Sequence, residues 1–378
     1  MSKVALVKCG SYDEIEVKKS LKKGLDLLGG INKFVEKDQK VLLKLNLLTG
    51  DVPEKCTTTN PIIFKALSEL LLSAGAIVSY GDSPAMGNTE AVARKVGFFQ
   101  IAEDLKIKLA DFLNGKEVFF DKGKQNKKFF IANAVFDNDV IISLPKFKTH
   151  GLTKFTGAVK NQFGCIPGLR KGEFHVRIPD HESFAKMLVD LNTFVNPKLY
   201  IMDGIMAMEG NGPRGGTPKK MGLLLLSTDP IALDATACRL INLNPEYVPT
   251  ITQGMKFGAG TYLEKDIQIV GDNFDEFVCP DFIVDRKPLK LYKKKGFLSL
   301  LNNLLVPKPY IQEEKCVKCG LCVNVCPVKP KALNWDKDNK QRPPKYNYNY
   351  CIRCYCCQEL CPHSVIKLKK PFLRRLFG

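Results

Sequence analysis

Eight cysteines in the last quarter of this 378-residue chain recur at a spacing that could hold metal. CVKCGLCVNVCP contains four of them, and CIRCYCCQELCP contains the other four at the same intervals. Both stretches fit C-x2-C-x2-C-x3-C-P, in which three thiolates bind one [4Fe–4S] cluster and the fourth completes the other. The spacing therefore predicts two [4Fe–4S] clusters, one held by Cys316, Cys319, Cys322 and Cys361, and one held by Cys326, Cys351, Cys354 and Cys357.

Two other interpretations of these cysteines are disfavoured. Zinc also binds paired C-x2-C sequences, but two complete four-cysteine runs, each followed by a proline, favour iron–sulfur clusters. Disulfides are disfavoured because the first residues, MSKVALVKCG, show no charged-then-apolar signal segment. Cys356 lies inside the second run but outside its spacing, and we interpret it as a bystander beside the cluster.

Positive charge is concentrated near the same end of the chain. The net charge is +18; residues 287–378 hold 20 Lys and Arg against 5 Asp and Glu, and residues 1–286 hold 37 against 34. This distribution favours an acidic redox partner protein. Nucleic acid is disfavoured, because no nucleic-acid motif accompanies the scattered lysines. Residues 293–309 and 367–378 mix basic and apolar side chains, so peripheral membrane contact is an alternative to their packing as linker and tail.

The location of the protein follows from two absences in the sequence. No apolar run reaches about 18 residues, the length expected of a membrane-spanning helix. Together with the missing signal segment, this predicts a cytoplasmic protein.

Residues 1–280 alternate between short apolar runs and stretches of helical periodicity. This alternation predicts an α/β fold, with a mainly parallel sheet covered by helices. Asn60 and Pro61 should cap and start one of the helices. The expected strands are 4–8, 41–45, 77–80, 140–144, 199–202, 222–226 and 267–270.

Polar residues recur where these strands end. Ligands of such sheets bind beyond the carboxyl ends of the strands. Lys44 lies at the end of the second strand and Asn46 follows it, and Asp203 follows the fifth. Asp82 and Asp229 occupy similar positions, but a turn or cap role is an equal alternative because a proline follows each of them. We expect the strand-end residues to line a ligand pocket.

The segment KTHGLTKFTGAVKNQFG combines cations with glycines. We predict a helix that begins near Thr153, so that its free N–H groups lie beside Lys148 and His150 and attract an anion. Lys160 and Asn161 then continue two faces of this helix at i, i+4 spacing. The alternative is a run of solvated lysines, which would not need the interleaved Gly, Thr and Asn.

The loop GNGPRGG is a second candidate anion site. Gly210 and Gly212 would expose backbone N–H groups, and Arg214 offers a planar fork of donors. The loop lacks the spacing of a Walker or dinucleotide fingerprint.

Three stretches, LPKFKTHGLTKFTGAVKNQFG, DGIMAMEGNGPRGG and DPIALDATA, together resemble the domain-of-unknown-function 362 family, which is commonly joined to a two-cluster ferredoxin module. About 55 residues around the cysteine runs likewise resemble the bacterial two-cluster ferredoxins. The resemblance permits coupling of the clusters to a deazaflavin, whose phosphorylated, glutamate-bearing tail would suit Lys and Arg side chains.

The chain is also distantly similar to nickel-pincer lactate racemases. In those enzymes a histidine precedes, by ten residues, the lysine that tethers the cofactor, and His150 and Lys160 match that spacing. The surrounding residues differ, and neither His175 nor His181 aligns securely with the other racemase histidines. The resemblance therefore implies a shared pocket and not a shared reaction.

We expect an iron–sulfur oxidoreductase that passes electrons between the clusters and an anionic cofactor or substrate. His150, Lys160 and Asp203 are the expected catalytic residues: His150 donates a proton, and Asp203 orients it or binds substrate. The alternatives are a ferredoxin-type carrier or adaptor with a docking domain, and a non-redox racemase or isomerase. The expected ligand-binding residues are Lys44, Asn46, Lys148, Asn161, Gly210, Gly212 and Arg214.

These inferences divide the chain into three parts. Residues 1–285 form an α/β ligand domain, and residues 286–309 form a basic linker. Residues 310–378 form an α+β domain of the bacterial-ferredoxin type.

Overall fold

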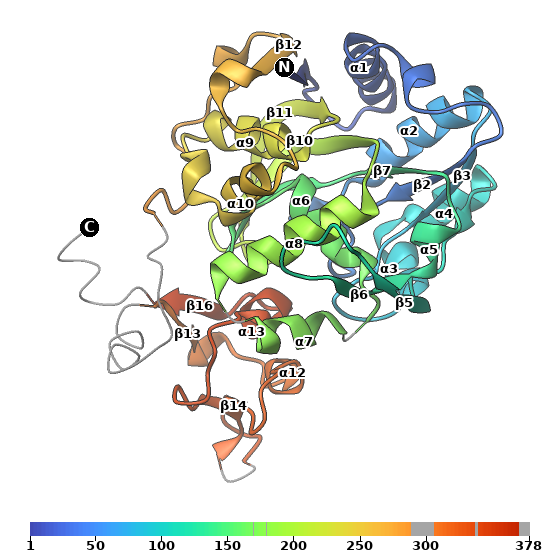
Figure 1. Ribbon diagram of the computed structural model, residues 1–378. Helices are drawn as coiled ribbons and strands as arrows, with labels where there is room; N and C mark the ends of the chain where they lie inside the picture. Colours follow the sequence, from blue (N-terminus) through green and yellow to red (C-terminus); the bar gives the residue numbers. More distant parts are fainter. Residues whose placement is uncertain (169, 179, 289–305, 337–338, 370–378) are drawn as a thin grey trace.

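The computed structural model describes residues 1–168, 170–178, 180–288, 306–336 and 339–369. A large α/β part carries a smaller cysteine-rich part at one end (Figure 1). The expected basic linker lies mostly outside the described residues, as do most of residues 293–309 and 367–378. Among the helices of the described ranges, none has the length and apolar character that a bilayer-crossing helix needs.

A ten-stranded sheet forms the centre of the α/β part, in the order β12-β1-β11-β10-β7-β2-β3-β4, with β8 pairing β10 and β9. Six of its neighbouring pairs are parallel and three are antiparallel, so the predicted mainly parallel sheet is confirmed. The strands are β1 (Ser2–Lys8), β2 (Lys40–Lys44), β3 (Ile77–Gly81), β4 (Lys108–Leu109), β7 (Val140–Ser143), β8 (Lys146–His150), β9 (Lys154–Thr156), β10 (Leu199–Glu209), β11 (Thr217–Ser227) and β12 (Ile267–Gly271).

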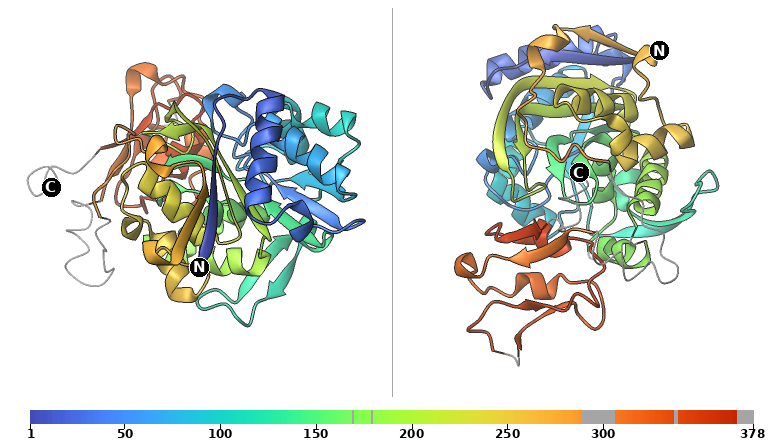
Figure 2. Two further views of the ribbon diagram at one scale, coloured as in Figure 1. Left: turned by 90° about the horizontal axis from the view of Figure 1, so that it is seen from above. Right: turned by 90° about the vertical axis from the view of Figure 1, so that its left-hand side faces the viewer.

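Helices cover both faces of this sheet (Figure 2). Two apolar cores result, one on each face. Asn60 caps its helix as predicted, accepting the N–H of Ile62 at 2.9 Å. One face carries α1 (Glu14–Leu27), α2 (Pro61–Ser73), α3 (Thr89–Val96) and α4 (Phe98–Asp104), and the other carries α6 (Ala158–Asn161), α8 (His181–Val195), α9 (Pro230–Leu240) and α10 (Pro249–Phe257). A hairpin of β5 (Gly115–Phe119) and β6 (Lys128–Ala132), with α5 (Asn133–Phe136), and the separate helix α7 (Arg170–Arg177) complete the part.

The strand expected at 199–202 is longer than the sequence indicates. β10 continues to Glu209 through an irregularity between Gly204 and Met206 and pairs along its length with β11. Asp203 therefore lies inside a strand and not at its end. The extension depends on β11, a partner that local periodicity does not reveal.

The helix expected near Thr153 is wrong. Strand β9 occupies Lys154–Thr156, and α6 begins only at Ala158. Asp234 sets this start, because its carboxylate accepts the N–H groups of Ala158 (2.6 Å) and Val159 (3.3 Å). A Cβ at Gly157 would lie 2.0 Å from the Asp234 carboxylate. The glycine therefore makes room for this cap and not for a ligand.

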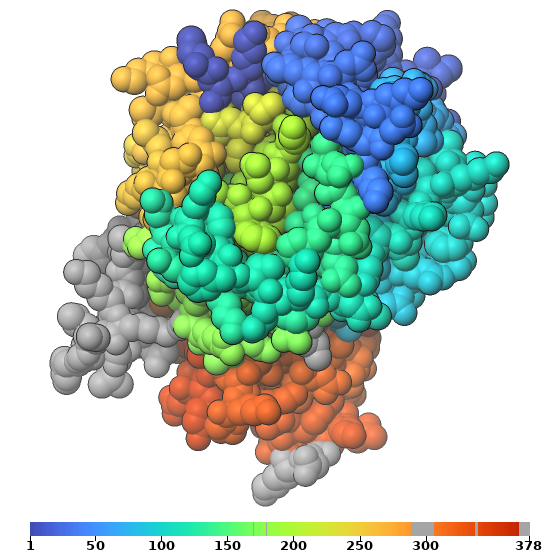
Figure 3. Space-filling view, turned by 45° about the vertical axis from the view of Figure 1, so that its right-hand side comes forward, coloured from blue at the N-terminus to red at the C-terminus, as the bar shows by residue number. Residues whose placement is uncertain are grey.

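The cysteine-rich part is a small α+β unit with its own apolar core. It lies directly against the α/β part (Figure 3). Its two antiparallel pairs are β13 (Lys308–Ile311) with β16 (Ile366–Lys369), and β14 (Leu333–Asn334) with β15 (Lys345–Tyr346); its helices are α12 (Leu321–Asn324) and α13 (Cys356–Leu360).

Candidate functional site

The eight regularly spaced cysteines gather around two separate hollows. Cys316, Cys319, Cys322 and Cys361 line the first, and Cys326, Cys351, Cys354 and Cys357 line the second. These are the two sets that the spacing predicts, including the exchange of the fourth cysteine between runs. The thiols are free of disulfides.

The donor set and its spread fit iron–sulfur clusters. Four thiolates are the ligands that a [4Fe–4S] cluster requires. A single zinc ion instead draws its four ligands within bonding distance of one point. In the described residues, no three His, Cys, Asp or Glu side chains converge tightly enough to hold one ion. Two hollows, each lined by four cysteines, fit two such clusters.

Helix α13 (Cys356–Leu360) lies within the second cysteine run and contacts the α/β part. Its residue Glu359 is buried, and its Oε1 atom lies 2.9 Å from Nε2 of His150, at the end of β8. The two atoms lack the alignment of a full hydrogen bond. The expected role of Asp203 in orienting His150 is therefore wrong, because Glu359 of the cysteine-rich part occupies that position.

The backbone fixes the tautomer of His150. Its Nδ1 atom accepts the N–H groups of Leu152 (2.9 Å) and Thr153 (3.3 Å), so Nδ1 carries no proton and the hydrogen of the neutral ring is on Nε2. Burial and the charge of Lys160 lower the pKa of His150 to about 4, against the opposing effect of Glu359. Near neutral pH, His150 therefore presents an Nε2–H donor to the Glu359 carboxylate.

Glu359 is held as a carboxylate. Burial alone would raise its pKa, but His150 and Lys160 hold the pKa down at about 2. An anionic side chain thus lies inside the contact between the two parts of the chain.

Lys160, on α6, brings a positive charge to the same place. Burial lowers its pKa, and the charges of Glu359 and Cys356 oppose that shift. Within the described residues, its ammonium group makes no hydrogen bond and no ion pair within 4 Å. A partly buried ammonium without a protein partner is available to a ligand.

His175, on α7, completes the group. Its ring stacks on Phe184 with centroids 4.6 Å apart and is buried, and Gly172 of the same helix lies against Pro327 of the cysteine-rich part. Burial lowers the pKa of His175 to about 4, and the charges of Glu359 and Lys160 reach it. No hydrogen bond to its ring is found in the described ranges. We call His150, Lys160, His175 and Glu359 the interdomain cluster.

Arg214 joins the two parts of the chain and does not present a free anion site. It donates to both carboxylate oxygens of Asp51, at 2.7 and 2.9 Å, and to the carbonyl of Leu360 at 2.8 Å. This last bond ties it to the end of α13. The expectation that Arg214 binds a cofactor is therefore corrected, because each of its three guanidinium nitrogens already donates a hydrogen bond within the protein.

The glycine-rich loop has the same docking role. The N–H groups of Gly210 and Gly212 donate to the carbonyl of Ile283 (2.7 Å) and the hydroxyl of Thr149 (3.2 Å), so neither N–H is offered to an anion. The carbonyl of Gly212 accepts the side-chain amide of Gln358, on α13, at 3.3 Å. The loop at Gly210 and Gly212, which was expected to bind an anion, thus binds helix α13.

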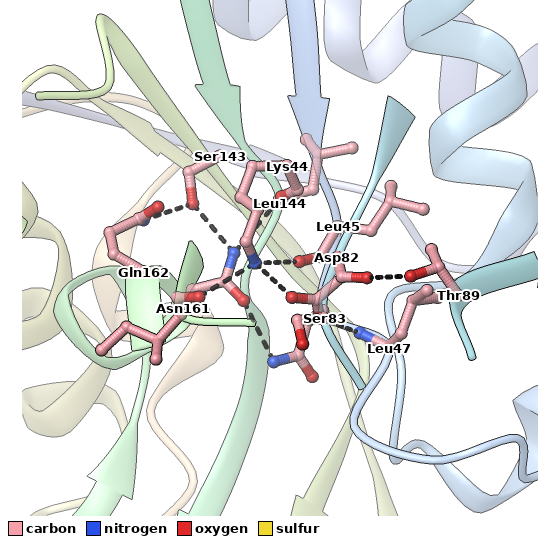
Figure 4. Close-up of polar contacts among 12 residues, drawn as sticks. Lys44, Leu45, Leu47, Asp82, Ser83, Thr89, Ser143, Leu144, Asn161 and Gln162 are labelled. Atoms are coloured by element: carbon pink, nitrogen blue, oxygen red, sulfur yellow. Dashed lines mark hydrogen bonds and ion pairs between the residues drawn. The ribbon is translucent and has the colours of Figure 1, made fainter. Parts of the chain in front are cut away.

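Lys44 and Asn161 belong to one buried polar network (Figure 4), and the half-buried Asn46 joins it. The ammonium of Lys44 lies 2.8 Å from Asp82 and donates to the carbonyl of Asn161 at 3.0 Å. Asn46 and Asn161 bond to each other through their side chains at 3.1 Å. A Cβ at Gly164 would lie 1.8 Å from the carboxylate of Asp82, so the glycine allows this pairing. The side chains of Lys44, Asn46 and Asn161, which were expected to bind a ligand, are therefore engaged within this network.

Replacing Lys44 by methionine should destabilise the protein by about 3–5 kcal/mol, because it leaves the buried Asp82 carboxylate unpaired. The matched control is Lys40→Met at the exposed first residue of the same strand, expected within about 0.5 kcal/mol of the native protein. The measurement is the midpoint of urea-induced unfolding under anaerobic conditions. Equal midpoints for the two variants would contradict the structural role of Lys44.

The remaining predicted residues are also engaged within the protein. Lys148 donates to Asn46 at 2.7 Å and to the carbonyl of Thr57 at 2.5 Å, and burial with nearby Lys160 lowers its pKa to about 7. Asp203 accepts Lys146 at 2.7 Å and Tyr12 at 2.8 Å. Of the predicted site residues, the interdomain cluster contains only His150 and Lys160.

Glu359 and His175 are the cluster residues that the sequence prediction did not assign. Glu359 is the only acidic residue in the second cysteine run, CIRCYCCQELCP. Its position as a charged residue between cluster ligands was the one sequence feature that could have indicated a role in the site. For His175 the sequence offered only a loop that could border a pocket.

Comparison with known proteins identifies both parts of the chain. Residues 41–239 match the family described as a domain of unknown function (DUF362), and residues 315–365 match a 4Fe-4S dicluster domain. An uncharacterized ferredoxin of Methanocaldococcus jannaschii is 39% identical over 59 residues, which is 16% of this chain and 74% of the ferredoxin. Iron–sulfur cluster binding and electron transfer are thus the role of the cysteine-rich part.

Two further matches each span more than 60% of this chain. A thylakoid-associated protein of a Synechocystis species is 37% identical over 256 residues, which is 68% of this chain and 79% of that protein. The lactate racemase apoprotein of Thermoanaerobacterium thermosaccharolyticum matches with a TM-score of 0.43 and 10% identity, over 64% of this chain and 56% of the racemase.

Proposed function

The chain belongs to the DUF362 family and carries a 4Fe-4S dicluster domain, and from this premise we propose that it is an oxidoreductase that exchanges electrons with an anionic ligand at the interdomain cluster. When bound, two [4Fe–4S] clusters supply single electrons at the two cysteine-lined hollows. The observation that carries the proposal is the contact of Glu359 with His150 at 2.9 Å.

Helix α13 supports the proposal because it belongs to both sites. The five residues Cys356–Leu360 include Cys357, which lines the second hollow, and Glu359, which contacts His150. Arg214 and the glycine-rich loop fix this helix against the α/β part. A ligand at the interdomain cluster would therefore lie within a few residues of the second set of cluster ligands.

The charges of the interdomain cluster favour an anion. The ammonium of Lys160 is uncommitted in the described residues, and the carboxylate of Glu359 is already adjacent to the Nε2–H of His150. A carboxylate or enolate would pair with Lys160, which would also stabilise the negative charge that reduction adds. His150, neutral and with its hydrogen on Nε2, would act as a hydrogen-bond donor beside Glu359.

A deazaflavin is a larger member of this ligand class. Lys148 and Arg214, the groups expected to hold its phosphorylated tail, are engaged in protein contacts. The proposal therefore names a small anionic ligand in which the reacting group itself binds Lys160.

Electrons would reach the clusters from an acidic partner protein, which the excess of lysines in the cysteine-rich part would attract. Cys319, in the first ligand set, is exposed, so the partner protein would approach the cluster on that side. We propose a cytoplasmic location, and the thylakoid-associated relative keeps a membrane-adjacent location as the alternative to test.

The proposal is tested on protein purified without oxygen. Bound small molecules are identified by mass spectrometry, and dithionite is then added while the absorbance of the clusters and of the ligand is followed. We expect electrons to appear on the ligand in proportion to those taken up by the clusters. Clusters that accept electrons while no bound or reducible molecule is found would contradict the proposal and favour a carrier or adaptor.

A further inference from the structure

A cavity of about 360 Å³ lies beside the interdomain cluster, where the two parts of the chain meet. Its walls come from β8, the glycine-rich loop, the segment around Val284, and the cysteine-rich part. Ligand pockets of proteins occupy roughly 300–1,000 Å³ and lie preferentially between domains. In size and position the cavity is a candidate binding site.

Tyr355 places this cavity next to the cluster ligands. The same side chain lines both the cavity and the second cysteine-lined hollow. Its ring is buried and its hydroxyl donates to the carbonyl of Pro307 at 3.0 Å, so the phenol is held in one orientation. A ligand in the cavity is thus separated from the second set of cluster cysteines by one aromatic side chain.

The walls combine apolar surfaces with few polar groups. Val284, Pro307 and Leu368 provide apolar contacts, and the glycine-rich loop brings bare backbone to the cavity. A flat ligand suits such walls, because it can stack on the Tyr355 ring and against backbone without Cβ atoms.

Two polar side chains of the cavity wall are available to bind polar atoms of a ligand. Lys367, on β16, lines the cavity, and in the described parts of the chain its ammonium makes no hydrogen bond or ion pair. His181 also lines it, and its Nδ1 lies 2.8 Å from the carbonyl of Leu152. A carbonyl only accepts, so Nδ1 carries the hydrogen and Nε2 remains an acceptor. Lys154 also lines the cavity, but its ammonium is engaged by Asp285, so the cavity offers a ligand the ammonium of Lys367 and the acceptor of His181.

We propose that this cavity is a second ligand site, which binds a planar, anionic, conjugated two-electron carrier of the size of a bicyclic quinone. Reduction of such a carrier takes two electrons from the iron–sulfur clusters, one from each, and two protons from solvent, and it converts two carbonyl groups into hydroxyls. The electrons that enter the clusters come from the acidic donor protein. The site adjoins the interdomain cluster at His150, which lines the cavity, but it does not include Lys160 or Glu359, which do not line it.

The test is binding of 2-hydroxy-1,4-naphthoquinone to the oxidised, cluster-loaded full chain, measured by equilibrium dialysis without oxygen. We expect saturable binding of one molecule per chain. Val284→Trp fills the cavity and should abolish binding. Lys367→Met should weaken binding about tenfold, because it removes a charge-assisted hydrogen bond. The control Lys369→Met removes an exposed lysine of the same strand that does not line the cavity, and should bind as the native protein does.

Iron content and cluster absorbance should be unchanged in these variants. Absence of saturable binding by the native protein overturns the proposal, and so does equal binding by the native protein and a cluster-loaded Val284→Trp or Lys367→Met variant. Lys160→Met should bind the probe as the native protein does. Loss of binding in that variant would transfer the probe to the interdomain cluster and contradict a second site, so this result is separable from the function proposed for Lys160.

Discussion

Replacement of Lys160 by methionine should lower electron transfer to the anionic ligand of the interdomain cluster at least about 100-fold, the order of loss when one preorganised stabilising group is removed. In the described residues Lys160 has no protein partner, so a structural role predicts no such loss. Methionine keeps much of the side-chain length and removes only the charge. The measurement is the rate at which electrons pass from dithionite-reduced clusters to the ligand.

The stability of this variant separates a ligand-binding role from a structural one. We expect the free energy of unfolding of Lys160→Met to lie within about 0.5 kcal/mol of that of the native protein, in contrast to that of Lys44→Met. Ligand content after purification should fall, and Lys160→Arg, which keeps the charge, should restore part of it. A variant with native electron transfer and native ligand content would exclude Lys160 from the site and support the carrier or adaptor.

Local patterns were sufficient to predict the sheet and the grouping of the cysteines. The strand at 41–45 corresponds to β2 (Lys40–Lys44), because its apolar run is buried on both sides. The spacing within each cysteine run is itself the geometric requirement of a cluster, so it predicts which thiols surround each hollow. In both cases the determining residues lie close together in the sequence.

The interdomain cluster could not be predicted in the same way, because its residues come from distant parts of the chain. Glu359 and His150 meet only because α13 docks on the α/β part. Arg214 was predicted to be free because sequence cannot show that its guanidinium nitrogens donate to Asp51 and to the Leu360 carbonyl. Whether a cation is available to a ligand depends on such long-range partners.

The helix expected near Thr153 failed for a related reason. Lys154 adopts a positive φ of 65°, and Asp234, from α9, accepts the first N–H groups of α6. The true start of the helix thus depends on a carboxylate that is remote in sequence. Lys160 still reaches the predicted region, since α6 carries it beside β8.

Cys356 and Cys357 are adjacent, similarly buried, and expected to behave differently. Cys357 lines the second hollow, whereas Cys356 lines neither. Cys357→Ala should therefore lose one cluster, so that iron falls from about eight to about four atoms per chain. Cys356→Ala should keep both clusters and its full iron content. The measurements are iron analysis and the electron paramagnetic resonance spectrum of the reduced protein.

The effect on electron transfer should follow the same division. Cys357 of the second ligand set lies on α13 with Glu359, so we expect the second cluster to pass electrons to the interdomain cluster. Cys357→Ala should abolish electron transfer to the ligand even though the first ligand set, around Cys316, remains complete. In Cys356→Ala transfer should persist, because Cys356 lines neither hollow. Loss of iron from Cys356→Ala, or undiminished transfer in Cys357→Ala, would show that the ligand sets are assigned wrongly.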